Sequence, residues 1–133
     1  MKKISPLKPL SKKRASEKRA YAKMCQEQDQ KMLDERGYLR CVSCGCNQPD
    51  GGHSHNLSVK HFPELECDSE NCKLRCMRCH KALDFPDFEE IIKFDDFQQL
   101  LEYRRTHDIH SYNRWVSALI ALGITDYPYE EEK

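Results

Sequence analysis

The sequence predicts a small α+β domain that a metal ion stabilises. Two Cys-x-x-Cys pairs, Cys41/Cys44 and Cys76/Cys79, bracket the middle of the chain, and such pairs are typical zinc ligands. Apolar residues recur with helical spacing on both sides of the central segment (residues 38–85) but not within it. With 133 residues the chain fits one compact domain, and a core of this size often needs a metal or a disulfide as a supplement.

A basic arm and a helix are expected before this centre. Residues 1–10 contain two prolines among lysines, which favours an extended arm. Ser11 is a suitable N-cap and Gly37 a suitable stop, so we expect a helix over residues 11–36. Residues 1–20 carry eight lysines and arginines against one glutamate, a pattern that attracts polyphosphate backbones but is also typical of a solvated tail. The basic residues of the helix expected to contact nucleic acid are Lys12, Lys13 and Arg14.

Helical spacing returns after the centre, in residues 86–124, and Gly123 supplies a stop. We expect the aromatic side chains of this segment, such as Trp115, to pack in the core. Residues 125–133 carry four acidic residues and one lysine, which predicts an acidic tail.

The compartment can be inferred from what the sequence lacks. The first residues are charged and no apolar run follows them, so a secretory signal is not expected. No stretch approaches the roughly 20 apolar residues of a membrane span. We therefore expect a cytoplasmic protein without a membrane partner. In a reducing compartment, paired cysteines indicate metal binding more than disulfides.

The two cysteine pairs predict a structural Zn²⁺ site. Zinc prefers four ligands in a tetrahedron, and two Cys-x-x-Cys turns supply four thiolates. Two alternatives for the ligand set stay open: Cys46 could replace Cys44, and Cys72 could join the second pair. Disulfides or a redox-active dithiol would not explain two matched pairs in one short segment.

The segment between the pairs carries residues suited to catalysis. His53 and His55 alternate, so a strand would place both side chains on one face. Asn71 lies further along, and His80 comes directly after the second pair, where a helix should begin. These residues are the candidates for the chemistry of the protein.

Three short motifs resemble those of the HNH endonucleases, which are also called ββα-metal nucleases. Ser-His-Asn-Leu-Ser (54–58), Asp-Ser-Glu-Asn (68–71) and Cys-Met-Arg-Cys-His (76–80) are similar to motifs of phage recombination nucleases of the NinG type and of small phage HNH proteins. The resemblance covers about residues 41–84. It implies a zinc-stabilised ββα-metal core between flanking helices, DNA as the partner, and the cytoplasm of a phage host as the compartment.

The resemblance also implies a role for each signature residue. His55 would be the general base that takes a proton from the attacking water, a task that suits imidazole because it titrates near neutral pH. Asn71 would hold the loop that orients His55, using both its donor and its acceptor. His80 would bind a catalytic divalent cation, Mg²⁺ or Mn²⁺, which stabilises the charge on the phosphate and on the leaving 3′ oxygen.

The sequence departs from the family pattern directly before the base. Many family members have an aspartate or histidine there that binds the metal, whereas this chain has Ser54, and serine is a poor ligand. Asp84, one helical turn after His80, or His53 would then supply a further ligand. Because Mg²⁺ keeps several waters, a site with few protein ligands remains workable. Basic residues expected to contact phosphate in this region are Lys60, Arg75, Arg78 and Lys81.

The predicted function is metal-dependent hydrolysis of DNA phosphodiester bonds, by a monomer or a homodimer that works beside other phage DNA-processing proteins. Ser54 keeps an alternative open, a zinc-finger module that binds nucleic acid without cutting it. A further alternative is a zinc-stabilised protein-interaction domain that uses the apolar side of its last helix, for instance as a dimer surface.

Overall fold

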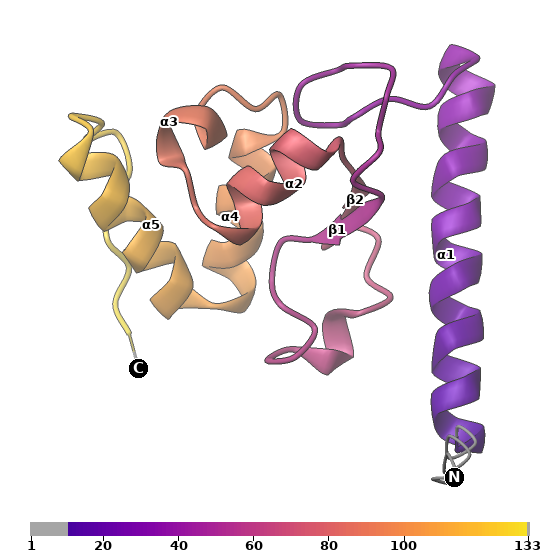
Figure 1. The fold of residues 1–133 in the computed structure, drawn as a ribbon. Coiled ribbons are helices and arrows are strands. Elements are labelled where there is room, and N and C mark those ends of the chain that lie inside the picture. Colours follow the sequence, from indigo (N-terminus) through magenta and orange to yellow (C-terminus); the bar gives the residue numbers. More distant parts are fainter. Residues whose placement is uncertain (1–10, 133) are drawn as a thin grey trace, which may run out of the picture.

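The computed structural model describes residues 11–132, so the basic arm predicted for residues 1–10 lies outside the described part of the chain. The chain forms a mixed domain of helices and one two-stranded sheet (Figure 1), as the predicted α+β class requires. In chain order the elements are α1 (Lys12–Arg36), β1 (His53–His55), the 3-10 helix η1 (Pro63–Leu65), β2 (Cys72–Leu74), α2 (Met77–Asp84), α3 (Phe88–Ile91), α4 (Phe97–His107) and α5 (Ile109–Ala121). Within residues 11–132 no helix is both long enough and apolar enough to cross a lipid bilayer.

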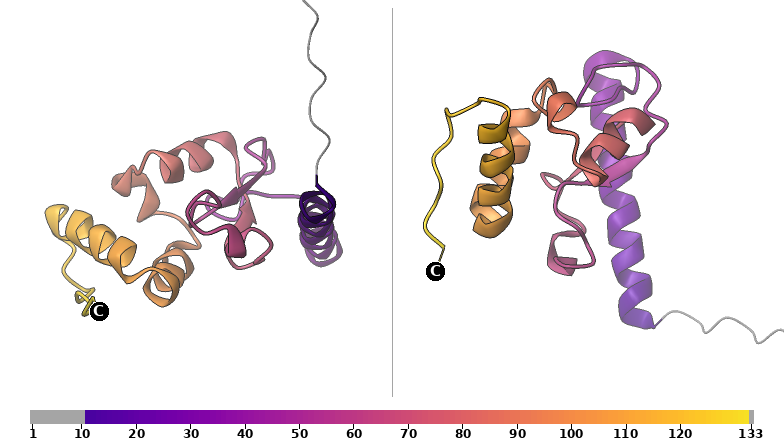
Figure 2. Two further views of the ribbon diagram at one scale, coloured as in Figure 1. Left: turned by 90° about the horizontal axis from the view of Figure 1, so that it is seen from below. Right: turned by 60° about the vertical axis from the view of Figure 1, so that its left-hand side comes forward.

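The α1 helix stands along one side of the molecule, next to the hairpin and away from α5 (Figures 1 and 2). Its ends follow from its sequence. The Ser11 hydroxyl accepts a hydrogen bond from the Arg14 N–H at 3.0 Å, and Gly37 ends the helix at a φ of 80°. None of the 25 residues of α1 is buried, so polar contacts rather than an apolar stripe attach it to the rest of the domain.

The hairpin of β1 and β2 fixes the side chains of the candidate residues His53 and His55. The strands are antiparallel, with His55 opposite Cys72. His53 and His55 share one face of the hairpin, as their alternation predicts, and α1 covers that face. His53 Nε2 lies 2.9 Å from Asp29 Oδ1, and the His55 ring stacks on Tyr21 with 5.6 Å between ring centroids.

The apolar core lies among α2, α3, α4 and α5. Trp115 of α5 is buried there, and the Phe88 ring meets it edge-on at 5.3 Å between centroids. The aromatic side chains of the C-terminal segment therefore pack inward as predicted. Cys41, Cys76 and Cys79 belong to the same buried cluster, which connects the thiols to the helical core.

The acidic tail packs against the last two helices. The Tyr112 hydroxyl donates to the Pro128 carbonyl at 2.8 Å. Asn113 exchanges two hydrogen bonds with the backbone of Glu130, at 2.8 and 2.9 Å. These backbone contacts give the described part of the tail a defined path, which its charge alone does not predict.

Arg75 is a structural residue, and its predicted contact with phosphate is wrong. Its side chain is fully buried. Nε donates to the Ser43 hydroxyl at 3.0 Å, one terminal nitrogen to the Ser54 hydroxyl at 2.8 Å, and the other to Asp96 Oδ2 at 2.7 Å. The guanidinium thus joins the first cysteine turn, β1 and the start of α4, and it has no surface left for a ligand.

We expect Arg75→Met to lower the free energy of unfolding by about 3–5 kcal/mol, because the ion pair with Asp96 and the hydrogen bonds to two hydroxyls would be lost. Arg78→Met is the matched control. Arg78 also forms an ion pair, at 3.0 Å from Glu90, but its side chain is 76% exposed, so its loss should cost less than about 1 kcal/mol. Urea unfolding of the two variants measures both values, and equal losses would contradict the structural role of Arg75.

Candidate metal centre and catalytic cleft

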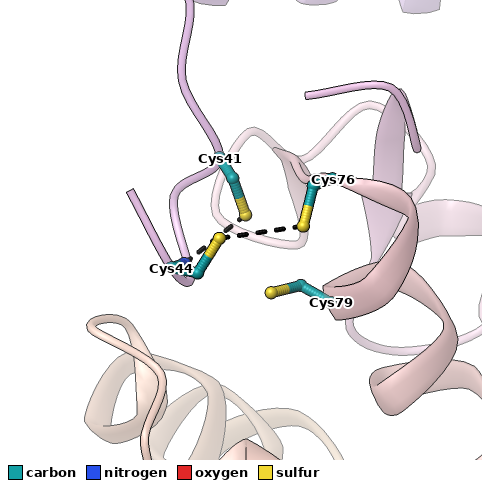
Figure 3. Close-up of side chains that lie close together, drawn as sticks. All are labelled: Cys41, Cys44, Cys76 and Cys79. Carbon is teal, nitrogen blue, oxygen red and sulfur yellow. Dashed lines mark hydrogen bonds between the residues drawn. The ribbon is translucent and has the colours of Figure 1, made fainter. Parts of the chain in front are cut away.

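Four thiols converge at the junction of the two cysteine turns (Figure 3). The sulfur atoms of Cys41, Cys44, Cys76 and Cys79 all lie within 4.8 Å of one another. Among residues 11–132 they form the one group of three or more ligating side chains close enough to share an ion. The set could hold a metal such as zinc. The alternatives with Cys46 or Cys72 as ligands are not supported, because neither residue belongs to this cluster.

The surroundings of these thiols fit a cation. Burial opposes ionisation of Cys41, but hydrogen bonds from the backbone of Cys44, Cys76 and Ser43 outweigh it and lower its pKa to about 7. Burial raises the pKa of Cys79 well above its usual range. A bound divalent ion would supply the positive charge that keeps four neighbouring thiolates ionised.

Asn71 clamps the loop between β1 and β2. Its side chain is fully buried. Oδ1 accepts from the Leu57 N–H at 2.7 Å, while Nδ2 donates to the carbonyls of Leu57 and Leu65 at 3.0 and 3.2 Å. The amide therefore pairs with three backbone groups, of which, among the described residues, only the Leu65 carbonyl has a second partner, the Asp68 N–H at 3.3 Å. The segment that it fixes begins directly after His55.

Two contacts fix the orientation of the His55 ring. Tyr21 of α1 stacks on it, and His55 Nε2 lies 3.0 Å from the Glu66 carbonyl oxygen. Since a carbonyl can only accept, Nε2 carries the proton and Nδ1 keeps its lone pair. This arrangement leaves Nδ1 as the nitrogen that can accept a proton from water.

His80 and Asp84 form a second pair of ligating groups, on the first and last turns of α2. His80 Nδ1 lies 3.1 Å from the Gly51 carbonyl, so Nδ1 donates and Nε2 is the nitrogen that faces Asp84. Nε2 lies 2.8 Å from Asp84 Oδ2. Gly51 packs directly against the backbone of Arg75 and Cys76, where a side chain would not fit. A Cβ on Gly51 would lie 2.8 Å from that backbone.

A cleft of about 440 Å³ is lined by both His55 and Asp84. His55 and the loop after it form one wall, and Asp84 stands on another. Asp84 therefore belongs both to this cleft and to the pair with His80, although His80 itself does not line the cleft. The remaining wall comes from α4 and α5, through Arg104, Asp108, His110, Ser111 and Arg114.

Neither the candidate ligand His53 nor its neighbour Ser54 lines this cleft. His53 points toward α1, where Asp29 occupies its Nε2, and it does not share an ion-sized cluster with His80 and Asp84. The structure therefore does not bring His53 together with the other candidate ligands of the catalytic cation. Ser54 points the opposite way and is buried against Arg75, so it does not face the cleft either.

The other predicted phosphate contacts are accessible. Lys60, Arg78 and Lys81 are exposed, as are Lys12 and Lys13 in the first turn of α1. Arg14 is half-exposed and forms ion pairs with Glu66 and Glu17, at 3.0 and 3.1 Å. Their contact with nucleic acid stays a prediction, since their exposure permits it without requiring it.

Two arginines of the cleft were not predicted as site residues. Arg104 continues the helical spacing of the buried residues Phe97, Leu100 and Leu101. A charged residue on such an apolar stripe is the one feature of the sequence that could have marked Arg104 as a site residue. Arg114 carries no signal at all, because an exposed arginine on the polar side of an amphipathic helix is ordinary. Contacts between distant segments place both of them near His55.

Comparisons with known proteins add no identification. No family model matches the sequence, and no curated protein or solved structure matches it either.

Proposed function

We propose that this protein is a metal-dependent endonuclease of the HNH type that hydrolyses DNA phosphodiester bonds. The observation that carries the proposal is the cleft shared by His55 and Asp84, with Asp84 Oδ2 2.8 Å from His80 Nε2. The hairpin, the Asn71 clamp and α2 are consistent with a ββα-metal core, and the four thiols would hold a structural zinc. DNA as the substrate follows from the resemblance in the sequence.

In the proposed reaction His55 Nδ1 removes a proton from water. The water oxygen then bonds to phosphorus, and the bond from phosphorus to the 3′ oxygen breaks. The Glu66 carbonyl and Tyr21 keep the imidazole oriented throughout, and Asn71 keeps the loop in place. His80 and Asp84 would hold Mg²⁺ or Mn²⁺, which would stabilise the negative charge on the phosphate and the leaving oxygen.

A second candidate is a zinc-stabilised module that binds nucleic acid without cutting it. The burial of Ser54 favours this candidate, because the position that carries a metal ligand in many HNH enzymes offers none here. Because His53 also points away, His80 and Asp84 are the only candidate protein ligands that remain for the catalytic cation. The two candidates differ in whether these two ligands support catalysis.

Nicking of supercoiled plasmid tests the proposal. We expect purified protein to nick plasmid in Mg²⁺ or Mn²⁺ but not in EDTA. Asp84→Asn should lower the rate at least tenfold, because it removes the anionic ligand. Asp34→Asn is the matched control, since Asp34 is exposed on α1 outside the cleft, and its rate should stay unchanged. Binding of plasmid without nicking under any divalent cation would favour the second candidate.

A further inference from the structure

Arg104 is a half-buried cation that neutral groups surround. Its Nε lies 2.9 Å from Asn56 Oδ1 and one terminal nitrogen 2.6 Å from the Asn56 carbonyl. The other terminal nitrogen donates to the Ser111 hydroxyl, and the guanidinium carbon lies 4.1 Å from the centre of the Trp115 ring. Among the described residues no carboxylate lies within ion-pair distance of it. Burial lowers the pKa of Arg104 to about 10, which still leaves it charged at neutral pH.

Arg114, one turn beyond Ser111 on α5, is the second cation of this wall. It is exposed, and within residues 11–132 its side chain forms neither a hydrogen bond nor an ion pair. Both arginines line the cleft that holds His55, and both line an adjoining cavity of about 150 Å³ with Phe88 and Trp115. Two like charges thus share one wall, and neither forms an ion pair with the described residues.

The carboxylates of the cleft form no ion pair with either arginine, although the charge of Asp108 acts on Arg104 from a longer distance. Asp84 is paired with His80, and Asp108 caps α5 by accepting a hydrogen bond from the Ser111 N–H. An anion that bound between the two guanidinium groups would relieve their repulsion and would gain charge-assisted hydrogen bonds. The cleft is open enough to admit an anion that belongs to a larger molecule.

We propose that Arg104 and Arg114 form an anion subsite that binds a phosphodiester group of nucleic acid in the cleft of His55. The proposal rests on the proposed nuclease function and assigns the C-terminal helices a part in substrate binding. Arg104 is the fixed element of the subsite, because Asn56, Ser111 and Trp115 hold its guanidinium. Arg114 is the second element, and its exposed side chain has its donors available for the phosphate.

The test measures binding separately from cleavage. A fluorescein-labelled 20-base-pair duplex is titrated with protein and followed by anisotropy, in EDTA and in Ca²⁺. We expect Arg114→Gln to weaken binding at least fivefold near 100 mM salt. The slope of log affinity against log salt should fall by about 0.9, as the loss of one phosphate contact predicts. Arg36→Gln is the control, because Arg36 is an exposed arginine in the last turn of α1, outside the cleft, and its affinity should change less than twofold.

A second variant separates binding from folding. Arg104→Gln should weaken duplex binding too. Because Arg104 also holds Asn56, the substitution could disturb the fold, so the thermal melting of this variant is compared with that of the wild type. Arg114 has no such structural contact, and Arg114→Gln should melt as the wild type does. Equal affinities for Arg114→Gln and Arg36→Gln, or no duplex binding by the wild type in either buffer, would overturn the proposal.

The outcomes also distinguish this proposal from the nuclease function. Weaker binding by Arg114→Gln together with no plasmid nicking by the wild type would keep the subsite and reject the nuclease. Plasmid nicking by the wild type together with unchanged binding by Arg114→Gln would keep the nuclease and reject the subsite.

Discussion

His55→Ala is expected to lower the rate of DNA cleavage by about 10²–10⁴-fold, the usual contribution of a positioned general base. The reason is the fixed ring: Nε2 is committed to the Glu66 carbonyl, so only Nδ1 can accept the proton of the attacking water. Single-turnover cleavage of a labelled duplex in Mn²⁺ measures the loss. Duplex affinity should change little, because His55 contributes a lone pair to the reaction rather than a charge to binding.

His61→Ala is the matched control for this experiment. His61 lines the same cleft and is exposed, and its ring forms no hydrogen bond with the described residues. We expect its cleavage rate to stay within about threefold of the wild-type rate, well inside the effect of losing a general base. Equal rates for His55→Ala and His61→Ala would reject His55 as the base.

Cys76→Ser is expected to remove the cooperative unfolding transition of the domain. Structural zinc contributes an apparent binding free energy of about 10–16 kcal/mol in zinc-finger peptides, as much as the entire stability of a typical domain. The loss should be large here because Cys76 and its neighbours belong to the buried core cluster. Thermal melting by circular dichroism and zinc content by mass spectrometry measure the two effects.

Cys46→Ser serves as the control for the metal site. Cys46 is close in sequence to the first pair but lies outside the four-thiol cluster. We expect this variant to keep one zinc per chain and to melt as the wild type does. Loss of zinc from Cys46→Ser, or a wild-type melting curve for Cys76→Ser, would contradict the ligand set.

The parts of the fold that local sequence determines could be predicted. The cysteine spacing predicts the thiol cluster, because each Cys-x-x-Cys turn brings two sulfurs together by itself. Ser11 and Gly37 mark the ends of α1 for a similar reason, since each end depends on neighbouring residues only. The alternation of His53 and His55 predicts their shared face in the same way.

The parts that depend on distant contacts could not be predicted. Arg75 looks like a surface cation in the sequence, but it is buried because Ser43, Ser54 and Asp96 arrive from three other segments. His53 is likewise taken from the cleft by Asp29, a residue of α1. The wall of the cleft that α4 and α5 supply depends on how these helices pack against the hairpin loop, and no motif encodes that packing.

The claim that an imidazole and a divalent ion meet across a phosphate is tested most directly by crystals of the protein with bound DNA and Mn²⁺. Anomalous scattering distinguishes Mn²⁺ from zinc, so each ion can be located separately. We expect zinc at the four thiols and Mn²⁺ at His80 Nε2 and Asp84, with a phosphate between the Mn²⁺ and His55. Zinc at the thiols together with bound DNA but no Mn²⁺ at His80 and Asp84 would contradict the nuclease and leave a binding module.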